Sequence, residues 1–457
     1  MLIILLRQER QYNGLADQLV SYPVEATLLC IARPVPRIQF CAGGTLKIIF
    51  IYLAVLASLS PLSEAPLFGQ ASIEAWLTQV HFPAPELPAS MSPLGAGQAG
   101  PQDTPSIAGP GQSQVGAQAA RADPGNAPVA WINSRPLSMH ELRGKVVLID
   151  FWEYTCINCI RTFAENKRWY ERYHRDGFEI IGVHDPEFDI AYPVDHVAQA
   201  VKRFDLPYPI VVDDQFRIWN SYHNNTWPSR FLIDTKGTVR YHRDGEGGDS
   251  AFELAIRKLL EEAHPGLKFT AADAIPDEKN AFAPSCGFPT GEMYVGDWFG
   301  RGILANPEGY HGGKTIDYKL PKDVEDGRAA LAGRWQTDKN GMIYRGKNKT
   351  DKPGDDQLEM RYHARELYAV LNVSHGRASR LYIRQDGKDL TKENKGVDVQ
   401  FDEQGHSYIE VREPRMYYLV ANPTFGSHTV SLSPTRGGIT INSFTFGNNC
   451  QTDFAHL

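Results

Sequence analysis

The stretch Lys145-Val-Val-Leu-Ile-Asp-Phe-Trp-Glu-Tyr-Thr-Cys-Ile-Asn-Cys159 decides the fold of this chain. Its first half, 145–152, is an almost continuous apolar run, which is typical of a central strand buried on both faces. From Cys159 to Tyr173 the aromatic residues recur at helix-compatible spacing. The pair Cys156 and Cys159 is therefore expected between a buried strand and the first turn of a helix.

The region around this stretch, 131–265, alternates between strand-like and helix-like runs. The expected strands are 178–183, 208–212, 230–234 and 238–241, and the expected helices are 195–204 and about 250–263. The last two strands flank Thr-Lys-Gly and predict a hairpin. A βαβ arrangement followed by a hairpin and a helix predicts an α/β sandwich about the size of a thioredoxin-like domain.

After a polar connector at 266–284, the region 285–452 contains strands without intervening helices. The expected strands are 358–363, 367–373, 380–384, 406–411, 416–420, 429–432 and 438–446. Regular short strands separated by turn residues are typical of a β-sandwich, here a jelly roll. The predicted fold class is an α/β thioredoxin-like fold followed by a separate all-β sandwich.

The N-terminal region, 1–65, carries a signal-like segment. Lys47 precedes the apolar residues 48–57, and small and polar residues follow at 58–65, which is the pattern of a secretory signal. Because about 45 residues precede this segment, we expect that translation begins near Leu46. The alternative is an uncleaved anchor formed by 48–57. Both interpretations place the rest of the chain outside the cytoplasm.

Residues 66–130 are predicted to form a flexible tether. Between 83 and 128 there are 9 Pro and 7 Gly and no aromatic residue, so little apolar surface is available to offset the entropy of ordering. The net charge of the whole chain is −7, without a long run of Lys or Arg. This charge pattern argues against a nucleic-acid partner.

The position of the cysteine pair predicts thiol chemistry. Free N–H groups and the macrodipole at a helix start stabilise a thiolate, so the pKa of Cys156 is expected to be lowered. Cys156 would then attack a disulfide, and Cys159 would resolve the mixed disulfide. A zinc site and a static structural disulfide remain as alternatives. Haem attachment is excluded because Ile160, not His, follows the second cysteine.

Two acidic residues near the pair are candidates for proton or charge effects. Asp150 lies in the apolar strand, so burial should raise its pKa and suit it to exchange a proton with Cys159. The alternative is a carboxylate satisfied by a buried lysine or hydroxyl. Glu153 either raises the pKa of Cys156 or points into solvent.

Several stretches carry a family resemblance. They are Val147–Cys159, Trp131–Leu137, Gly182–Phe188, Tyr222–Pro228, Gly245–Gly247, Tyr294–Asp297, Leu331–Trp335 and Phe444–Gly447. These residues resemble the extracytoplasmic thioredoxin domain of DipZ-like proteins, which are relatives of the TlpA/ResA group. The likeness covers nearly everything from 131 to 450, including the β region. Within it, His184, Trp152 and Glu246 are expected to serve packing or hydrogen bonding.

Together with the signal-like segment, the resemblance implies an exported thiol–disulfide oxidoreductase. We expect no cofactor, and no metal because no second pair of Cys or His ligands accompanies Cys156 and Cys159. The resemblance also implies a cis peptide bond before Pro228, with Trp227 beside it, where backbone groups meet the substrate chain. Its partners would be protein thiols and disulfides of the cell envelope. Because only one apolar stretch is present, a separate membrane electron donor of the DipZ/CcdA type would re-reduce it. Cytochrome c maturation is one implied context.

The β region resembles carbohydrate-binding jelly rolls, so a glycan is a possible ligand. The available aromatics are Trp298, Trp335, Tyr310, Tyr344 and Tyr417, most of which we expect to be core residues. Cys286 and Cys450, at the two ends of this region, are expected to form a disulfide, with two free thiols as the alternative.

Two other functions remain open from the sequence. One is a non-catalytic glycan- or partner-binding protein whose Cys-x-x-Cys is a static disulfide. The other is a peroxidase of the peroxiredoxin type. The peroxidase is disfavoured because the residues before Cys156 do not supply a Pro-x-x-x-Thr-x-x-Cys loop.

Overall fold

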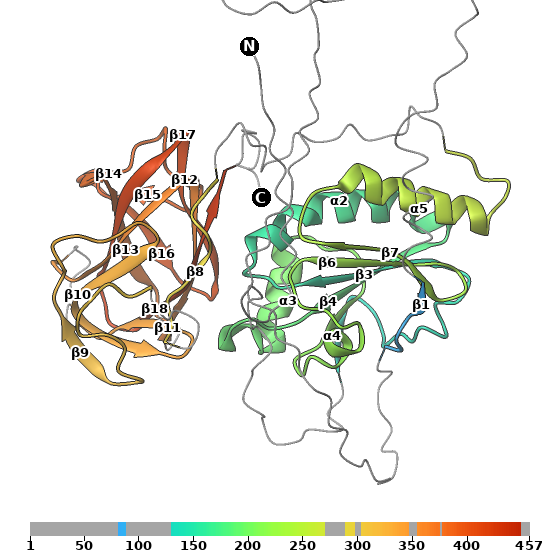
Figure 1. The fold of residues 1–457 in the computed structure, drawn as a ribbon, viewed down its shortest axis with the longest axis horizontal. Helices are drawn as coiled ribbons and strands as arrows, with labels where there is room; N and C mark the ends of the chain where they lie inside the picture. Colours follow the sequence, from blue (N-terminus) through green and yellow to red (C-terminus); the bar gives the residue numbers. More distant parts are fainter. Residues whose placement is uncertain are drawn as a thin grey trace, which may run out of the picture. The chain divides into compact units, whose positions relative to one another are not determined.

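The computed structural model describes residues 81–87, 129–269, 288–297, 303–346, 354–374 and 377–448. All of them belong to one compact unit, Ala65–Leu457. They form a first domain, built on a seven-stranded sheet, and a β domain, built on an eleven-stranded sheet (Figure 1). No helix in these ranges is long and apolar enough to span a membrane. The segment 48–57, Cys286 and Cys450 lie outside the described residues.

The sheet of the first domain is centred on the strand that the sequence singles out. Its strands are β1 (Phe82–Pro83), β2 (Ala130–Ile132), β3 (Val146–Trp152), β4 (Phe178–His184), β5 (Ile210–Val212), β6 (Ser229–Ile233) and β7 (Thr238–Asp244). They follow the order β1-β7-β6-β3-β4-β5-β2. β3 runs parallel to β4 and antiparallel to β6. All seven residues of β3 are buried, as its apolar sequence predicts.

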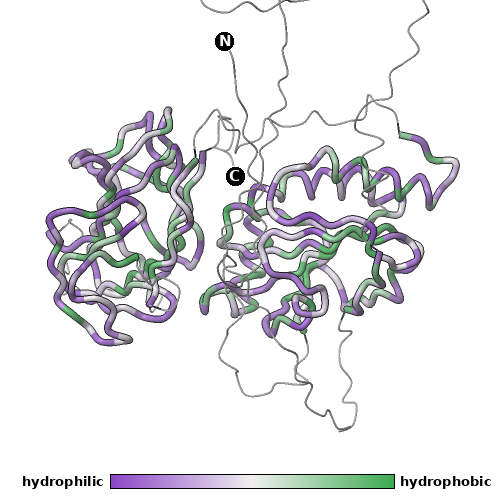
Figure 2. Tube along the Cα trace, in the orientation of Figure 1, coloured by the Kyte–Doolittle hydropathy of each residue, from purple (hydrophilic) through white to green (hydrophobic). Residues whose placement is uncertain are grey.

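Helices cover both faces of this sheet. They are α2 (Ile157–Tyr173), α3 (Val194–Arg203), α4 (Arg217–Ser221) and α5 (Asp249–Ala263), with short 3-10 turns at His174–Asp176 and Asp189–Ala191. Side chains of β3 alternate between two apolar clusters, because successive residues of a strand point to opposite faces. Leu148 and Trp152 pack with α2, α3 and α5, while Ile149 and Phe151 pack with α4. Figure 2 shows hydrophobic residues concentrated in the centre of the sheet.

The predicted hairpin is confirmed as β6 and β7, and the last predicted helix as α5. One difference falls within the expected tether. Residues 82–83 form β1 on the edge of β7, and Leu87 is fully buried. The prolines that suggest a tether are tolerated there because an edge strand leaves some N–H groups unpaired. The domain boundaries at 65, 130, 265 and 284 otherwise remain predictions.

The β domain contains strands without an α-helix among its described residues. Its strands are β8 (Met293–Tyr294), β9 (Thr315–Tyr318), β10 (Arg328–Asp338), β11 (Gly341–Tyr344), β12 (Gln357–Val373), β13 (Ser379–Gln385), β14 (Lys388–Asp389), β15 (Gln400–Phe401), β16 (Ser407–Val411), β17 (Arg415–Pro434) and β18 (Ile439–Gly447). The all-β class is confirmed, and the jelly-roll topology stays a prediction. β12 and β17 are each one long strand where the sequence predicts two.

Candidate active site

The two cysteines occupy the junction between β3 and α2. Cys156 is the N-cap of α2, with an extended backbone, and its Sγ accepts a hydrogen bond from the Cys159 N–H at 3.2 Å. Cys156 is half-buried, whereas Cys159 is fully buried in the first turn. Both are free thiols. Cys156 is therefore the residue of the pair that reaches solvent, whereas Cys159 does not.

The pKa of Cys156 is shifted in the opposite direction to the one predicted from the sequence. Burial raises the pKa of Cys156, and the carboxylates of Glu187 and Glu292 raise it further, against the lowering effect of the hydrogen bond with Cys159. The predicted lowering at a helix start is thus outweighed by loss of solvent around the sulfur. Burial also raises the pKa of Cys159 well above its usual value.

Asp150 lies on β3, six residues before the pair, and is completely buried. Burial raises its pKa to about 7, although Arg230, its neighbour across the sheet on β6, and a hydrogen bond from Asn166 oppose the shift. Asn166 Nδ2 donates to Asp150 Oδ2 at 2.8 Å. The hydrogen-bond donor to the carboxyl is therefore an amide, and not the lysine or hydroxyl of the alternative interpretation, while Asp150 Oδ1 is buried without a hydrogen-bond partner. Its charge contributes to the raised pKa of Cys159.

Glu153 does not point into solvent, because it is fully buried. Its carboxylate accepts the Thr155 N–H at 2.6 Å and also the Thr155 hydroxyl. Burial raises its pKa to about 7. Glu153 Oε1 lies 3.8 Å from His184 Nε2, and burial lowers the pKa of that histidine to about 3, so the ring is neutral. His184 stacks on Tyr154 at 5.7 Å, which fits the packing role expected from the sequence.

The cis peptide bond implied by the resemblance is present between Trp227 and Pro228. Pro228 is buried and directly precedes β6, whose first residue, Ser229, pairs with Phe151 of β3. Pro228 thus lies at the same end of strands β3 and β6 as the loop that leads to Cys156. Trp227 is half-buried and packs on Trp219, with ring centroids 4.4 Å apart.

Sequence reasoning missed the contribution of the β domain to this site. Tyr294 of β8 donates a hydrogen bond from its phenol to Glu187, which follows β4. The Tyr294 hydroxyl also lies 3.2 Å from Glu292, and its ring is 6.0 Å from that of Phe188. Glu187 and Tyr294 both fall within the stretches that carry the family resemblance. That resemblance was the available signal, but it did not indicate that the two residues meet.

A second contact between the domains is centred on Arg161, in the second turn of α2. Its side chain is 6% exposed and forms ion pairs at 3.1 Å with Glu246 of the first domain and with Glu366 of β12. The guanidinium also lies 5.5 Å from the centre of the Tyr368 ring. Glu246 is thus confirmed in a hydrogen-bonding role, and it helps to hold the β domain near the cysteine pair.

Most of the aromatic residues considered for sugar binding are core residues. Trp335 is 0% exposed, and Tyr344 and Tyr417 are each 1% exposed. Tyr310 is partly buried against the same core, and Trp298 lies outside the described residues. A stacking platform for a sugar requires an exposed ring face, which the three buried rings do not offer.

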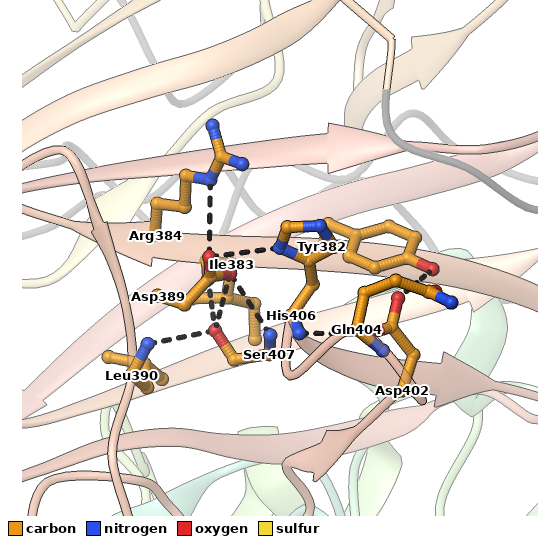
Figure 3. Close-up of polar contacts among 9 residues, drawn as sticks. All are labelled: Tyr382, Ile383, Arg384, Asp389, Leu390, Asp402, Gln404, His406 and Ser407. Atoms are coloured by element: carbon orange, nitrogen blue, oxygen red, sulfur yellow. Dashed lines mark hydrogen bonds and ion pairs between the residues drawn. The ribbon is translucent and has the colours of Figure 1, made fainter.

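A polar cluster in the β domain joins β13, β14 and β16 (Figure 3). His406 Nδ1 lies 3.0 Å from Asp389 Oδ2, and Ser407 follows the histidine. The Ser407 hydroxyl is buried, donates to the Ile383 carbonyl and accepts the Leu390 N–H. Its proton therefore faces a carbonyl oxygen and not the histidine, so this serine is not arranged as a nucleophile. The cluster ties the three strands together.

Among the described residues, no group of three or more His, Cys, Asp or Glu side chains is arranged to hold a metal ion. The proposed pair Cys286 and Cys450 lies outside the described residues. Their disulfide remains a prediction.

Comparisons with known proteins agree with this geometry. A family described as "Thioredoxin like C-terminal domain" matches residues 290–447, and the AhpC/TSA family matches residues 127–242. The chain is 32% identical to Protein DipZ of Mycobacterium bovis over 325 residues, which are 69% of this chain and 41% of that protein. It is 29% identical to thiol-disulfide oxidoreductase ResA of Bacillus cereus over 134 residues, 29% of this chain and 75% of ResA.

Among solved structures, a thiol-disulfide isomerase from Corynebacterium glutamicum is 24% identical, with a TM-score of 0.27, and the match covers 30% of this chain and 97% of that one. The resemblance to DipZ and ResA proteins, stated from the sequence, is confirmed by the sequence relatives. The fold class is confirmed as a thioredoxin-like domain followed by an all-β domain. The chain spans 41% of the length of the DipZ protein that it matches.

Proposed function

We propose that this protein is a thiol–disulfide oxidoreductase that acts on protein thiols and disulfides. The observation that carries the proposal is the arrangement of the two sulfurs. Cys156 is half-buried at the N-cap of α2 and accepts the Cys159 N–H, while Cys159 is fully buried behind it. This is the geometry that a two-step exchange requires, with one attacking and one resolving thiol.

In the reducing direction, the Cys156 thiolate attacks one sulfur of a partner disulfide. A mixed disulfide forms, the partner disulfide breaks, and the second partner sulfur leaves as a thiolate that takes up a proton. Cys159 then loses its proton and attacks the Cys156 sulfur, which forms the Cys156–Cys159 disulfide and breaks the bond between Cys156 and the partner. The partner sulfur leaves as a thiolate and takes up a proton, so the partner is released as a dithiol. Two electrons pass to the partner, and Asp150, with a pKa of about 7, accepts the proton of Cys159.

The acidity of Cys156 favours the reducing direction. Strong oxidants of this fold stabilise the attacking cysteine as a thiolate and so stabilise their reduced form. Here burial raises the pKa of Cys156 and outweighs the stabilising hydrogen bond from the Cys159 N–H. We therefore place the protein on the reductant side, with Trp227 and Pro228 presenting backbone groups to the partner chain.

The finer assignments follow from the resemblance to DipZ and ResA proteins. We place the protein outside the cytoplasm, with a separate membrane donor of the DipZ/CcdA type supplying its electrons. Cytochrome c maturation is a candidate pathway. Comparison of the redox state of Cys156 and Cys159 in cells with and without such a donor tests this assignment. An unchanged redox state would contradict it.

Insulin reduction with dithiothreitol as electron source tests the proposed activity. The wild-type protein should accelerate insulin precipitation, Cys156→Ser should abolish the acceleration, and Cys159→Ser should accumulate a mixed disulfide visible on a non-reducing gel. Equal rates for wild type and Cys156→Ser would favour the alternative, a binding protein with a static disulfide.

The AhpC/TSA match makes a peroxidase the second candidate. Peroxide consumption with a dithiol donor distinguishes the two functions. Because the loop before Cys156 lacks the proline and threonine expected of a peroxiredoxin, we expect no acceleration of peroxide loss above the Cys156→Ser background. Rapid, Cys156-dependent peroxide loss without insulin reduction would support the peroxidase instead.

A further inference from the structure

A cavity of ≈ 290 Å³ lies between the first domain and the β domain. Its walls include Tyr154, Ile157 and Ile160 from the first domain and Val397, Met416 and Tyr418 from the β domain. The volume is at the low end of the range for small-ligand pockets, which is about 300–1,000 Å³. It therefore admits a group the size of a side chain.

Two residues that line the cavity, Tyr154 and Ile157, are close neighbours of Cys156 in the sequence. Ile157 directly follows Cys156 and is the first residue of α2, and Tyr154 precedes Cys156 by two residues. A polypeptide whose cysteine meets Cys156 would bring the neighbouring side chains of that polypeptide to this wall. This wall belongs to the same loop and helix turn as the thiol. One bound segment of the partner can therefore contact both the cavity and Cys156.

The charged residues around the cavity are paired within the protein. Arg203 forms an ion pair with Glu413 at 3.0 Å, and Arg415 pairs with Asp398 at 2.7 Å. Because these charges are already paired within the protein, they are less available to bind a charged ligand. The groups left to receive a ligand are the apolar faces of the isoleucines, Met416 and Val397.

The wall that the β domain provides is held firmly in place. The Arg161 ion pairs with Glu246 and Glu366 are almost completely buried, and Tyr368 is part of the apolar core of the first domain. Tyr418 donates to Glu366 at 3.0 Å and stacks on Tyr368, with ring centroids 4.4 Å apart. Buried contacts between the two domains therefore hold the two walls of the cavity together.

We propose that this cavity binds an apolar side chain next to the target cysteine of the partner protein. The inference rests on the proposed disulfide exchange and adds its substrate preference: extended segments with an uncharged, apolar residue beside the cysteine. Val397 is 51% exposed although it lines the cavity, so an apolar side chain that enters would cover it. Burial of one Leu-sized side chain contributes about 1.5–3 kcal/mol, which corresponds to at least about a tenfold preference.

The test uses two short peptides that differ only in the residue after their single cysteine, which is Leu in one and Ser in the other. Each cysteine is joined in a disulfide to thionitrobenzoate, whose release is followed by absorbance. The wild-type protein, reduced beforehand and separated from the reductant, should react with the Leu peptide with a second-order rate constant about tenfold higher than with the Ser peptide. Val397→Trp, which fills the cavity, should reduce this ratio to about one. Leu320→Trp, at a 37% exposed site of the β domain outside the cavity, should keep it.

The ratio of the rate constants for the Leu and Ser peptides is measured within each variant. A misfolded fraction lowers both rate constants equally, so it leaves this ratio unchanged. Calorimetric binding of the same peptides with Ala in place of Cys separates this inference from the proposed function. A Leu preference in binding, lost in Val397→Trp, supports the cavity even if no disulfide is reduced. Equal second-order rate constants and equal binding of the two peptides by the wild type would overturn it, as would a preference unchanged in Val397→Trp.

Discussion

At the scale of single residues, two buried carboxyl groups flank the cysteine pair. Asp150 and Glu153 are both fully buried, and burial raises the pKa of each to about 7. Their positions differ: Asp150 influences Cys159, whereas Glu153 is bound to Thr155, the residue before Cys156. The sequence alone predicts the burial of Asp150 because it interrupts an apolar strand. It does not predict the burial of Glu153, since that residue follows the strand in a loop.

Asp150→Asn should change the pH dependence of stability. The pKa of Asp150 is raised in the folded protein, so between about pH 4 and pH 7 the folded state binds more protons than the unfolded state. The stability that this group contributes is therefore complete below about pH 4 and is lost as pH rises through 7. Urea unfolding at pH 5 and pH 8 should show a smaller fall for Asp150→Asn than for wild type. An equal fall would contradict the assigned burial.

The same substitution should slow catalysis. General acid–base groups contribute about 10²–10⁴-fold to rates, so we expect insulin reduction by Asp150→Asn to fall by about 10²-fold at pH 7. The step affected is the resolution by Cys159, so single-turnover traces should show accumulation of the mixed disulfide. Asn166→Ala, which removes the hydrogen bond but keeps the carboxyl, serves as the control and should lose much less activity. If the two variants lost the same activity, Asp150 would be a packing residue.

The acidity of Cys156 can be measured by alkylation. Because burial and the carboxylates of Glu187 and Glu292 raise its pKa, the iodoacetamide rate should reach half its maximum above pH 8.5, the usual thiol value. Glu187→Gln should shift this midpoint downward. Glu325→Gln, whose side chain is 80% exposed on the β domain, should leave it unchanged. A midpoint near pH 7 in the wild type would restore the helix-start interpretation.

At the scale of elements, the sequence predicts helices and strands well where a hydrophobic period extends over many residues, and poorly where the element is short. β3, β4, the β6–β7 hairpin and α5 were all recognisable, because each has a run of apolar residues with one period. α4 has only five residues, too few to show a helical period. The sequence predicts two strands where β17 is one, and its pairing with β12 is interrupted by a register shift between Ala421 and Gly426 before it resumes.

The contact made by α2 with the β domain has a measurable energetic consequence. Arg161→Met removes the cation from two buried carboxylates, Glu246 and Glu366. Breaking a buried ion pair in this way costs about 3–5 kcal/mol, and denaturant unfolding should show a loss of that size. Arg135→Met, which breaks an exposed pair with Glu141, should cost less than about 1 kcal/mol. Similar losses in both variants would mean that the Arg161 network does not stabilise the two-domain arrangement.

At the scale of the whole molecule, the β domain contacts residues around the cysteine pair. Tyr294 reaches Glu187, Glu366 reaches Arg161, and Tyr368 enters the core of the first domain. Both domain types could be predicted from their patterns, but the contacts between them could not, because they join residues far apart in sequence. The resemblance to DipZ proteins runs through both domains, which is consistent with a site that needs both.

The predicted disulfide between Cys286 and Cys450 also belongs to this scale. It would join the beginning and the end of the β region, and closing a loop of this length is expected to contribute roughly 4–5 kcal/mol of stability. Peptide mapping without reductant should find the two cysteines in one linked pair of peptides. Two separately alkylated cysteines would show that the β domain is stable without this bond.

The most direct test of the account is the redox equilibrium of Cys156 and Cys159, followed by thiol trapping in dithiothreitol buffers. We expect one two-electron transition, absent in Cys156→Ser, at a potential nearer that of thioredoxin (about −270 mV) than that of DsbA (about −120 mV). A pair that stays oxidised in excess dithiothreitol, or that cannot be alkylated because it retains a metal ion, would contradict the claim that these sulfurs exchange bonds with other proteins.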